Sequence, residues 1–265
     1  MILSEIWIYP VKSLGGIRLT EALTEEKGLR YDRRWMIVDE NGLFQTQRFS
    51  PEMALIDVAL QAGGLKIFSR NNPENYTLVP FEPVSKETIS VKVWNDVVDA
   101  VTVSDAVDQW LSAELGKTVR LVMMPENTQR KADPRYAMHD ENVSFADGFP
   151  FLVISQASLD DLNSRLPEPV SMARFRPNFV ITGTKPFAED EWKSITIGNA
   201  TFEIVKPCAR CIMTTINPAT AEKGVEPLKT LATYRKINNK ILFGQNVVAA
   251  AFGIVKAGDE VTVTQ

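Results

Sequence analysis

Short apolar stretches, either alternating or continuous, recur along most of the chain and predict a protein built mainly from β-strands. In the first half, these stretches are rich in β-branched and aromatic residues and are separated by turn signals such as Asn41-Gly42 and Gly63-Gly64. They cover residues 2–9, 33–40, 53–60, 64–69, 89–94 and 97–104. In the second half, strands are expected over residues 178–183, over 194–207 on either side of a turn at Gly198-Asn199, and over 246–255 and 259–265.

Two segments change to a helical spacing of apolar residues. Residues 104–116 end at Gly116, which is typical of a helix C-cap, and in residues 155–166 we expect Ser158 to cap a helix with Asp161 at its third position. The apolar positions that define the two faces are Val107, Trp110, Leu111 and Leu115, and Leu159, Leu162 and Leu166. Many short strands with few helices favour a β-rich, mixed α+β architecture or β-barrels over a doubly wound sheet.

The length and composition suit one large or two small domains, since the chain has 265 residues of which 45% are apolar. Residues 126–142 carry few large apolar side chains, so we place a boundary there, between a first domain of residues 1–125 and a second of residues 126–265. No apolar run approaches the roughly 18 residues needed to cross a bilayer, and the N-terminus lacks the features of a signal peptide. Only two cysteines fit a reducing compartment, and we expect a cytoplasmic protein with no membrane partner.

The distribution of charge is more informative than the total. A net charge of −4 argues against a nucleic-acid partner. Residues 206–256, however, contain eight Lys or Arg and two acids, a net charge of +6 within an acidic protein. This segment is either a solvated basic face or one side of an anion site, and charge alone favours the solvated face.

The basic segment begins at the two cysteines of the chain, Cys208 and Cys211, which are separated by two residues. Such a pair can be a redox couple, half of a zinc site, two buried thiols, or one metal thiolate beside a bystander. A structural zinc site needs four ligands, and with His139 as the only histidine the chain offers three at most.

The residues around the cysteines argue against a thioredoxin-like redox pair. Residues 212–216 are β-branched and predict more strand, whereas a thioredoxin-like pair begins a helix. Lys206 and Arg210 lie beside the thiols, and nearby cations favour the thiolate form, which is both a nucleophile and a soft-metal ligand. A reactive or metal-bound cysteine is therefore slightly favoured over simple burial.

At this point the sequence resembles a known family. Residues 208–235, CARCIMTTINPATAEKGVEPLKTLATYR, resemble the signature of the molybdenum-cofactor-binding domain of MOSC proteins, in the branch that contains the mitochondrial amidoxime-reducing component and its bacterial homologues. YPVKSLGG (9–16), YDRRWMIVD (31–39) and TQRFSP (46–51) resemble the N-terminal MOSC-associated β-barrel domain, and 151–166, 174–183 and 241–246 also match the family. The resemblance implies a β-barrel-like domain at 1–125 and a MOSC β-barrel domain with flanking helices at 126–265.

The resemblance also implies roles for individual residues. Cys211 corresponds to the molybdenum ligand, and a pyranopterin dithiolene would supply two more sulfur atoms. Lys12, Ser13 and Arg33 would hold the terminal phosphate of the cofactor, and Arg176 and Asn178 would contact the pterin. Arg210 would add positive potential, and Asp147 falls where the family keeps an acid that could deliver protons.

The function implied by the resemblance is a molybdenum-cofactor-dependent reductase of N-hydroxylated small molecules, acting by oxygen-atom transfer from the N–O bond to the metal. Asn246 departs from the branch, which tends to carry an aromatic residue there. The chain has no ferredoxin-type cysteines, so we expect a separate electron donor, either a ferredoxin or a flavin reductase. Two alternatives stay open: a cofactor or sulfur carrier that uses Cys211, and a metal-free thiol-redox or binding module that uses both cysteines.

Overall fold

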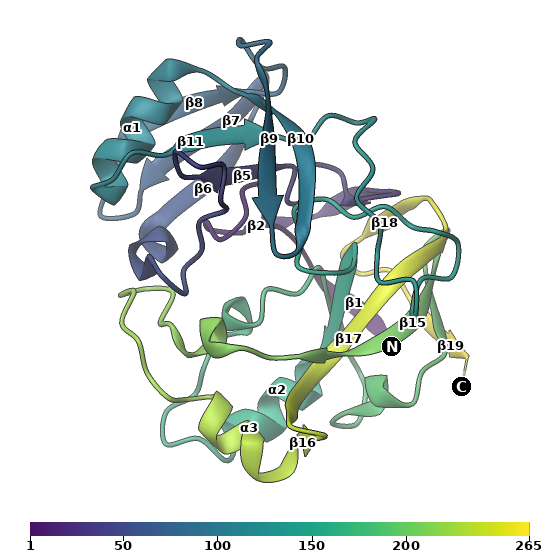
Figure 1. The fold of residues 1–265 in the computed structure, drawn as a ribbon. Coiled ribbons are helices and arrows are strands. Elements are labelled where there is room, and N and C mark those ends of the chain that lie inside the picture. The colour runs from purple at the N-terminus through teal and green to yellow at the C-terminus, as the bar shows by residue number, and fades with distance from the viewer. Residues whose placement is uncertain (265) are drawn as a thin grey trace.

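The longest sheet in the protein draws its strands from both ends of the chain. The computed structural model, which describes residues 1–264, is shown in Figure 1. Its nine-stranded sheet has the order β19-β14-β15-β17-β12-β13-β1-β2, with β16 paired to β17. These strands are β1 (Ile2–Ile8), β2 (Ile17–Leu19), β12 (Phe151–Ser155), β13 (Phe179–Thr182), β14 (Ser194–Ile197), β15 (Ala200–Ala209), β16 (Lys236–Ile237), β17 (Lys240–Ala251) and β19 (Val261–Thr264). All pairs are antiparallel except β12 with β13.

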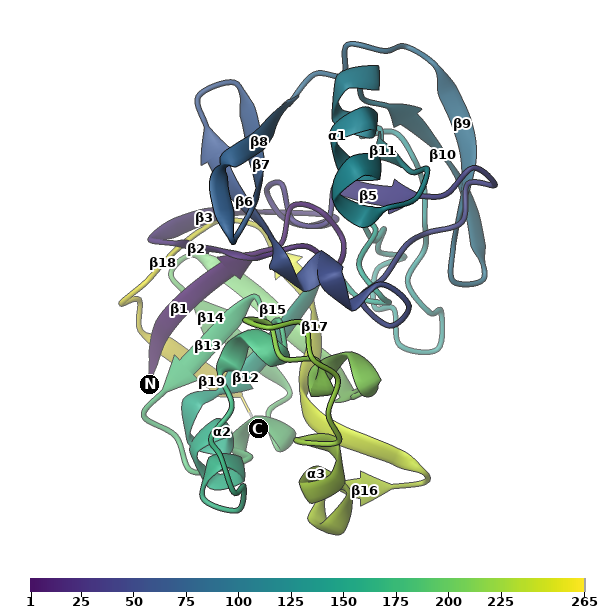
Figure 2. The same ribbon diagram turned by 90° about the vertical axis from the view of Figure 1, so that its left-hand side faces the viewer.

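Three smaller sheets complete the β structure. A four-stranded sheet has the order β5-β11-β10-β9, and three-stranded sheets have the orders β6-β7-β8 and β18-β3-β4. Their strands are β3 (Glu21–Glu25), β4 (Gly28–Leu29), β5 (Trp35–Val38), β6 (Ile56–Gln61), β7 (Gly64–Ser69), β8 (Asn72–Pro80), β9 (Thr88–Val93), β10 (Asp96–Thr102), β11 (Arg120–Met123) and β18 (Ile254–Lys256). Figure 2 shows the β5–β11 strands on one side of the molecule and most of the nine-stranded sheet on the other.

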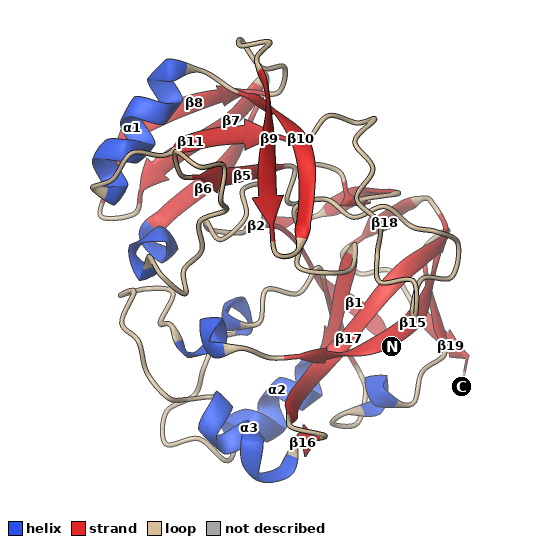
Figure 3. Ribbon diagram, in the orientation of Figure 1, coloured by secondary structure: helices blue, strands red, loops and turns tan. Residues whose placement is uncertain are grey.

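Helices are few and short, as the colouring of Figure 3 shows. The α-helices are α1 (Asp105–Leu115), α2 (Gln156–Asn163) and α3 (Leu228–Tyr234), and the 3₁₀ turns are η1 (Pro51–Leu55), η2 (Met172–Arg174), η3 (Ala188–Asp190) and η4 (Ile212–Thr215). The predicted β-rich, mixed α+β fold is confirmed. The predicted division near residues 126–142 stays a prediction, and the N-terminal strands β1 and β2 belong to the nine-stranded sheet.

Two apolar cores hold these layers in place. In the nine-stranded sheet, Phe151, Phe179 and Phe202 are fully or almost fully buried and lie with ring centroids 5.0 to 5.8 Å apart. In the N-terminal part, Val107 and Leu111 on one face of α1 are buried with residues of β5, β6, β7, β8 and β11. Burial of this apolar surface is what stabilises the fold.

The first predicted helix is confirmed with its caps, but the cap of the second was wrong. The Ser104 hydroxyl accepts a hydrogen bond from the Val107 N–H, and Gly116 ends α1 with a left-handed φ of 62°. In α2 the cap is Ser155, not Ser158, because β12 runs directly into the helix and leaves Ser155 extended. Ser158 lies within α2 and donates its hydroxyl to buried Glu189.

Three predicted strands were also wrong in part. Residues 53–55 form the end of η1, and the strand begins only at Ile56. Residues 246–255 are split between β17 and β18, because at Gly253 the backbone approaches Asn199 so closely that a Cβ would lie 2.2 Å from its Oδ1. Residues 212–215 form η4 instead of a strand, and only Ile216 after it is extended.

The η4 turn follows from its threonines. The hydroxyls of Thr214 and Thr215 donate to the carbonyls of Cys211 and Ile212, at 3.0 and 2.7 Å. Such local bonds between side chain and backbone compete with extended structure and close a tight turn. The turn positions Cys211 immediately after β15, as the N-cap of η4.

Candidate functional site

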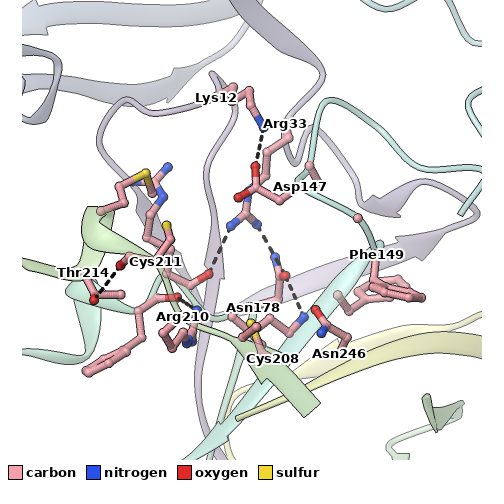
Figure 4. Close-up of a pocket in the computed structure, with 18 of the residues that line it drawn as sticks. Lys12, Arg33, Asp147, Phe149, Asn178, Cys208, Arg210, Cys211, Thr214 and Asn246 are labelled. Atoms are coloured by element: carbon pink, nitrogen blue, oxygen red, sulfur yellow. Dashed lines mark hydrogen bonds and ion pairs between the residues drawn. The ribbon is translucent and has the colours of Figure 1, made fainter. Parts of the chain in front are cut away.

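A cavity of about 300 Å³ lies where loops from both halves of the chain meet. It is lined by all of the site residues predicted from the sequence: Lys12, Ser13, Arg33, Asp147, Arg176, Asn178, Arg210 and Cys211. Figure 4 labels these residues except Ser13 and Arg176. They come from the segment after β1, the segment before β5, the loops before β12 and β13, and the end of β15. Their roles as metal, phosphate, pterin and proton-transfer residues stay predictions.

The cavity is strongly positive. Its lining contains a single carboxylate, Asp147, and seven cationic side chains: Lys12, Arg33, Arg48, Arg174, Arg176, Lys206 and Arg210. Cations gathered around a cavity repel one another unless an anion is bound among them. The lining therefore favours an anionic ligand, and it places two members of the basic segment, Lys206 and Arg210, at a site instead of on a solvated face.

The ring of Tyr9 orders two of the arginines. The guanidinium carbons of Arg33 and Arg176 lie 4.3 and 4.1 Å from its centroid. Fully buried Asp32 accepts from Arg33 Nη1 at 2.6 Å and from the Tyr9 N–H at 2.7 Å. Burial lowers the pKa of Arg176 to about 10, with repulsion from Arg33 adding to the effect. Burial also raises the pKa of Tyr9 to about 12.

Three of the predicted cofactor residues have backbone conformations that residues other than glycine rarely adopt. Ser13, Arg33 and Arg176 have φ values of 70°, 50° and 54°. Residues in this left-handed region are strained by roughly 1 to 3 kcal/mol each and persist only where the surroundings fix them. Three of the ten non-glycine residues with positive φ thus lie at the cavity wall, where the fold has to hold them in place.

Two guanidinium groups, those of Arg176 and Arg210, each have a nitrogen that donates no hydrogen bond in the part of the chain that the structure describes. Arg176 Nη1 donates to the Leu14 carbonyl at 2.8 Å, and Arg210 donates through Nε and Nη1 to the Phe243 and Phe175 carbonyls. The Nη2 atoms of both arginines are buried and have no hydrogen-bond partner among residues 1–264. An unsatisfied buried donor costs about 1 to 3 kcal/mol, so an acceptor on a bound ligand would be strongly favoured here.

Asn178 is already largely occupied by the protein. Its Oδ1 accepts from the Leu152 N–H at 3.1 Å and from Arg33 Nη1 at 3.4 Å, and its Nδ2 donates to the Trp7 carbonyl at 3.1 Å. Only one amide hydrogen remains for a ligand. Asn178 therefore ties β1 to β12 and holds Arg33 (Figure 4), in addition to facing the cavity.

Asp147 forms the centre of a second charged group. Lys12 Nζ donates to it at 2.6 Å and to the Phe145 carbonyl at 2.7 Å, Trp94 Nε1 donates at 3.3 Å, and an Arg48 nitrogen lies 3.6 Å away. Burial alone would raise the pKa of Asp147, but attraction to Lys12 and Arg48 outweighs it and holds the pKa well below its usual range.

The proton of this group resides on lysine. Burial lowers the pKa of Lys12 to about 8, and Asp147 opposes that shift. The Asp147 side chain is 58% exposed, so water screens part of the attraction without changing its direction. At neutral pH the pair is an ammonium beside a carboxylate, and a proton leaving the pair would come from Lys12.

The two cysteines differ in their surroundings. Arg48 Nη2 donates to Cys211 Sγ at 3.0 Å, so a cation lies in direct contact with this sulfur atom. Burial raises the pKa of the Cys208 thiol, which keeps it protonated. The two thiols do not form a disulfide, and Figure 4 shows their sulfur atoms at separate places on the wall. The environment of Cys211 suits a metal ligand better than that of Cys208.

Sequence reasoning missed Arg48, Tyr9, Asp32 and Trp94. Each lies within or next to a segment noted for the family or for a strand, but none carries a local signal of its role. Their importance comes from contacts between residues far apart in the chain, such as Arg48 with Cys211. Asn246, the residue that departs from the branch, also lines the cavity and donates to the Lys206 carbonyl.

A metal at this site would need ligands from outside the protein. Within the described part of the chain, no group of three or more His, Cys, Asp or Glu side chains could hold a metal. A single thiolate does not complete the coordination of a metal. A cofactor that brings its own sulfur ligands and a phosphate fits this arrangement, because Cys211 offers the thiolate and the arginines offer charge and unused donors.

Comparison with protein families decides the classification. The model of the MOSC N-terminal beta barrel domain matches residues 1–118, and that of the MOSC domain matches residues 140–262. Human mitochondrial amidoxime-reducing component 1 is 33% identical over 278 residues, which cover 97% of this chain and 81% of the relative. The chain belongs to the MOSC family. The predicted membership is thereby confirmed.

The chain is also similar to a second amidoxime-reducing component and to a molybdenum cofactor sulfurase. Mitochondrial amidoxime reducing component 2 of Bos taurus is 32% identical over 97% of this chain and 82% of the relative. Molybdenum cofactor sulfurase of Oryza sativa subsp. japonica is 33% identical over 91% of this chain, but this covers only 32% of the relative.

Within residues 1–264, no helix is both long and apolar enough to cross a membrane.

Proposed function

We propose that this MOSC protein is a molybdenum-cofactor-dependent oxidoreductase that reduces N-hydroxylated small molecules. The proposal is supported by the extent of similarity to the amidoxime-reducing components, which covers 97% of the chain. The single structural observation that carries it is the cavity that joins the Cys211 thiol to seven cations and one carboxylate. A thiolate for a soft metal and an excess of cations for a phosphate are what such a cofactor needs.

Different residues of the cavity would bind different parts of the cofactor. Cys211 would bind the metal, Lys12, Ser13 and Arg33 would hold the phosphate, and Arg176 and Arg210 would offer their unused Nη2 donors. When bound, the cofactor supplies the exchange of two electrons and of an oxygen atom with the substrate. The unsatisfied donors and strained residues of the wall are preorganised for such a ligand.

The chain itself contributes charge and a proton. Arg48 lies between the Cys211 thiol and the Asp147 carboxylate and compensates the negative charge of both. Lys12 holds the proton of the pair at neutral pH and would be the group that donates it, while the Asp147 carboxylate, for which proton delivery was predicted, would hold the ammonium group at the cavity. The two electrons would come from a ferredoxin or a flavin reductase, because residues 1–265 contain two cysteines and an iron–sulfur cluster needs four ligands.

The test measures cofactor and activity separately. Protein purified from a host that makes the cofactor is analysed for molybdenum and for oxidised fluorescent pterin. Reduction of benzamidoxime and hydroxylamine is then followed with chemically reduced viologen as the electron donor, so that the result does not depend on the natural partner. Protein that contains neither metal nor pterin would refute the proposal.

A second candidate is a carrier of the cofactor or of sulfur. It is favoured by the similarity to molybdenum cofactor sulfurases and by the free thiol of half-buried Cys211. A carrier would contain molybdenum or a Cys211 persulfide detectable by mass spectrometry, yet would reduce no N-hydroxylated compound with viologen. The metal-free dithiol alternative has less support, because burial favours the protonated Cys208 thiol.

A further inference from the structure

A second cavity, of about 550 Å³, lies next to Cys211 on the side of η4 and α3. Its wall is apolar and is formed by Ile212, Ile216, Val225, Leu228, Ala232 and Ile241. Leu228 and Ala232 lie one turn apart on α3, so they present the same side of the helix. A volume of several hundred Å³ with mostly apolar walls is typical of a pocket for a small organic molecule.

Two apolar side chains at this cavity are left largely exposed. Ile212 is 57% exposed and Val225 is 64% exposed. Exposed apolar surface beside a reactive group gains free energy when a ligand covers it, at about 25 cal/mol per Å². The occupant is therefore expected to have an apolar body.

The charged residues of this cavity all have one sign. Arg48, Lys223 and Lys229 line it, and no carboxylate does. Neither lysine forms an ion pair with a carboxylate anywhere in residues 1–264. The two nearest acids in sequence, Glu222 and Glu226, do not line the cavity and, among the described residues, form no ion pair with either lysine; Glu222 accepts from the Thr220 hydroxyl and Glu226 from the Thr230 N–H. The free charge at this cavity thus calls for an anionic group on the occupant.

The wall is fixed by its own hydrogen bonds. The Gly224 N–H donates to the Thr215 carbonyl at 3.1 Å, Ile216 pairs with Lys223 in a β-bridge, and the Lys229 N–H donates to the Val225 carbonyl at 3.0 Å. The segment between η4 and α3 is thereby closed on itself. A pocket that is already formed loses little free energy to ordering when a ligand binds.

The two cavities share one lining residue, Arg48, and lie on either side of it. Arg48 lines both, and its Nη2 lies 3.0 Å from Cys211 Sγ. Ile212 directly follows Cys211 in the chain. A molecule in the second cavity would therefore contact Arg48 and Ile212, the two residues that adjoin the proposed metal ligand.

We propose that this second cavity is the substrate pocket and that it selects N-hydroxylated compounds with an apolar ring and an anionic substituent. The ring contacts the apolar wall, and the anionic group, a carboxylate in the simplest case, is attracted by Lys223 and Lys229. This orientation leaves the N–OH end toward Cys211. The inference rests on the proposed reductase function and names the substrate class for it.

The test compares three substrates that use the pocket to different extents. Hydroxylamine is too small to contact it, benzamidoxime offers a ring, and 4-carboxybenzamidoxime offers a ring with a carboxylate. Ala232→Trp fills the pocket, with Thr233→Trp on an exposed position of α3 as the matched control. Lys223→Gln/Lys229→Gln removes its charge, with Lys240→Gln as the control, because exposed Lys240 precedes Ile241 and does not line the pocket.

The expected results follow from these contacts. Ala232→Trp should lower kcat/KM for both ring substrates about tenfold, mainly through KM, and leave hydroxylamine reduction unchanged. In the double lysine variant, the ratio of kcat/KM for 4-carboxybenzamidoxime to that for benzamidoxime should fall about fivefold. The two control variants, Thr233→Trp and Lys240→Gln, should match the wild type. Wild-type protein without such a preference, or ring substrates unaffected by Ala232→Trp, would overturn the inference.

Binding in the absence of an electron donor separates this inference from the proposed function. Titration calorimetry with 4-carboxybenzamidoxime requires no turnover. If the wild type reduces none of the three substrates, the reductase proposal fails; binding weakened by the lysine substitutions would then still support the pocket, and unchanged binding would refute it. The lysine variant changes only exposed side chains, so this measurement does not depend on whether Ala232→Trp folds.

Discussion

Replacement of Asp32 by Asn tests whether the cavity wall depends on a buried ion pair. Asp32 is fully buried, and its carboxylate accepts from Arg33 Nη1 at 2.6 Å and from the Tyr9 N–H at 2.7 Å. Removal of one partner from a buried pair typically costs about 3 to 5 kcal/mol, because the other charge stays buried without compensation. Asn is nearly isosteric and can still accept from Tyr9, so the substitution removes the charge and changes little else.

The remaining contacts of Arg33 set the expected magnitude. Its side chain is 13% exposed, and it keeps its bonds to the Arg176 carbonyl at 3.1 Å and to Asn178. These contacts place the expected loss at the lower end of the range, about 3 kcal/mol of unfolding free energy. The matched control is Asp161→Asn, which breaks the exposed pair with Arg165 on α2 and should cost about 0.5 kcal/mol.

The assay is urea unfolding of cofactor-free protein, followed by tryptophan fluorescence and by circular dichroism to check that the two transitions coincide. Arg33→Met and the double variant complete a mutant cycle, and the double variant should lose at least about 1 kcal/mol less than the sum of the single variants. If Asp32→Asn costs no more than Asp161→Asn, the pair does not stabilise the wall as we infer. The same variant should also retain less cofactor, because Arg33 would no longer be held against Tyr9.

Three further predictions concern the site itself. Cys211→Ser should lose molybdenum, measured by elemental analysis, whereas Cys208→Ser should keep it; equal loss in both would contradict the ligand assignment. Arg176→Met and Arg210→Met should each reduce pterin content at least about tenfold, because each removes a buried cation with an unused donor; unchanged content would show that these donors do not face the cofactor. In cofactor-free protein the pKa of Lys12 is lowered from 10.5 to about 8, so the unfolded chain holds a proton there that the folded chain has released. Between pH 8 and pH 10.5 the free energy of unfolding should therefore rise with pH by at most about 3 kcal/mol more in the wild type than in Lys12→Met, as measured by urea unfolding at several pH values. Parallel pH profiles of the two proteins would refute the lowered pKa.

Local pattern predicted those parts of the fold that depend on neighbours in sequence. The α1 helix was found with both caps, because a serine hydroxyl and a left-handed glycine act within one turn of the chain. Residues 212–215 were missed as a turn, since their β-branched character indicates a strand and only the threonine hydroxyls reverse that preference. The pairing of β18 with β3 joins segments more than 200 residues apart, and no local pattern reports it.

The site could be predicted only through the family resemblance. Spacing and charge alone marked Cys208 and Cys211 as candidates for reactive thiols and left the basic segment as a solvated face. The resemblance named eight residues that the structure brings to one cavity. It did not indicate Arg48, whose contact with Cys211 spans 163 positions, or the stacking of two arginines on Tyr9, because such contacts exist only in the folded chain.

The carboxylates around the cavity divide its cations into two groups. Arg33 is paired with Asp32, and Lys12 and Arg48 with Asp147, while Lys206 lies 3.8 Å from Asp133. The three cations without a carboxylate partner in residues 1–264 are Arg174, Arg176 and Arg210.

This division bears on where an anionic cofactor gains most. A phosphate held by Lys12 and Arg33 has to share both cations with carboxylates that are already in contact, which reduces the net attraction. An anionic or acceptor-rich group near Arg176 and Arg210 competes with no carboxylate and also satisfies two buried donors. The larger part of the binding free energy should therefore come from Arg176 and Arg210, and the smaller part from Lys12 and Arg33.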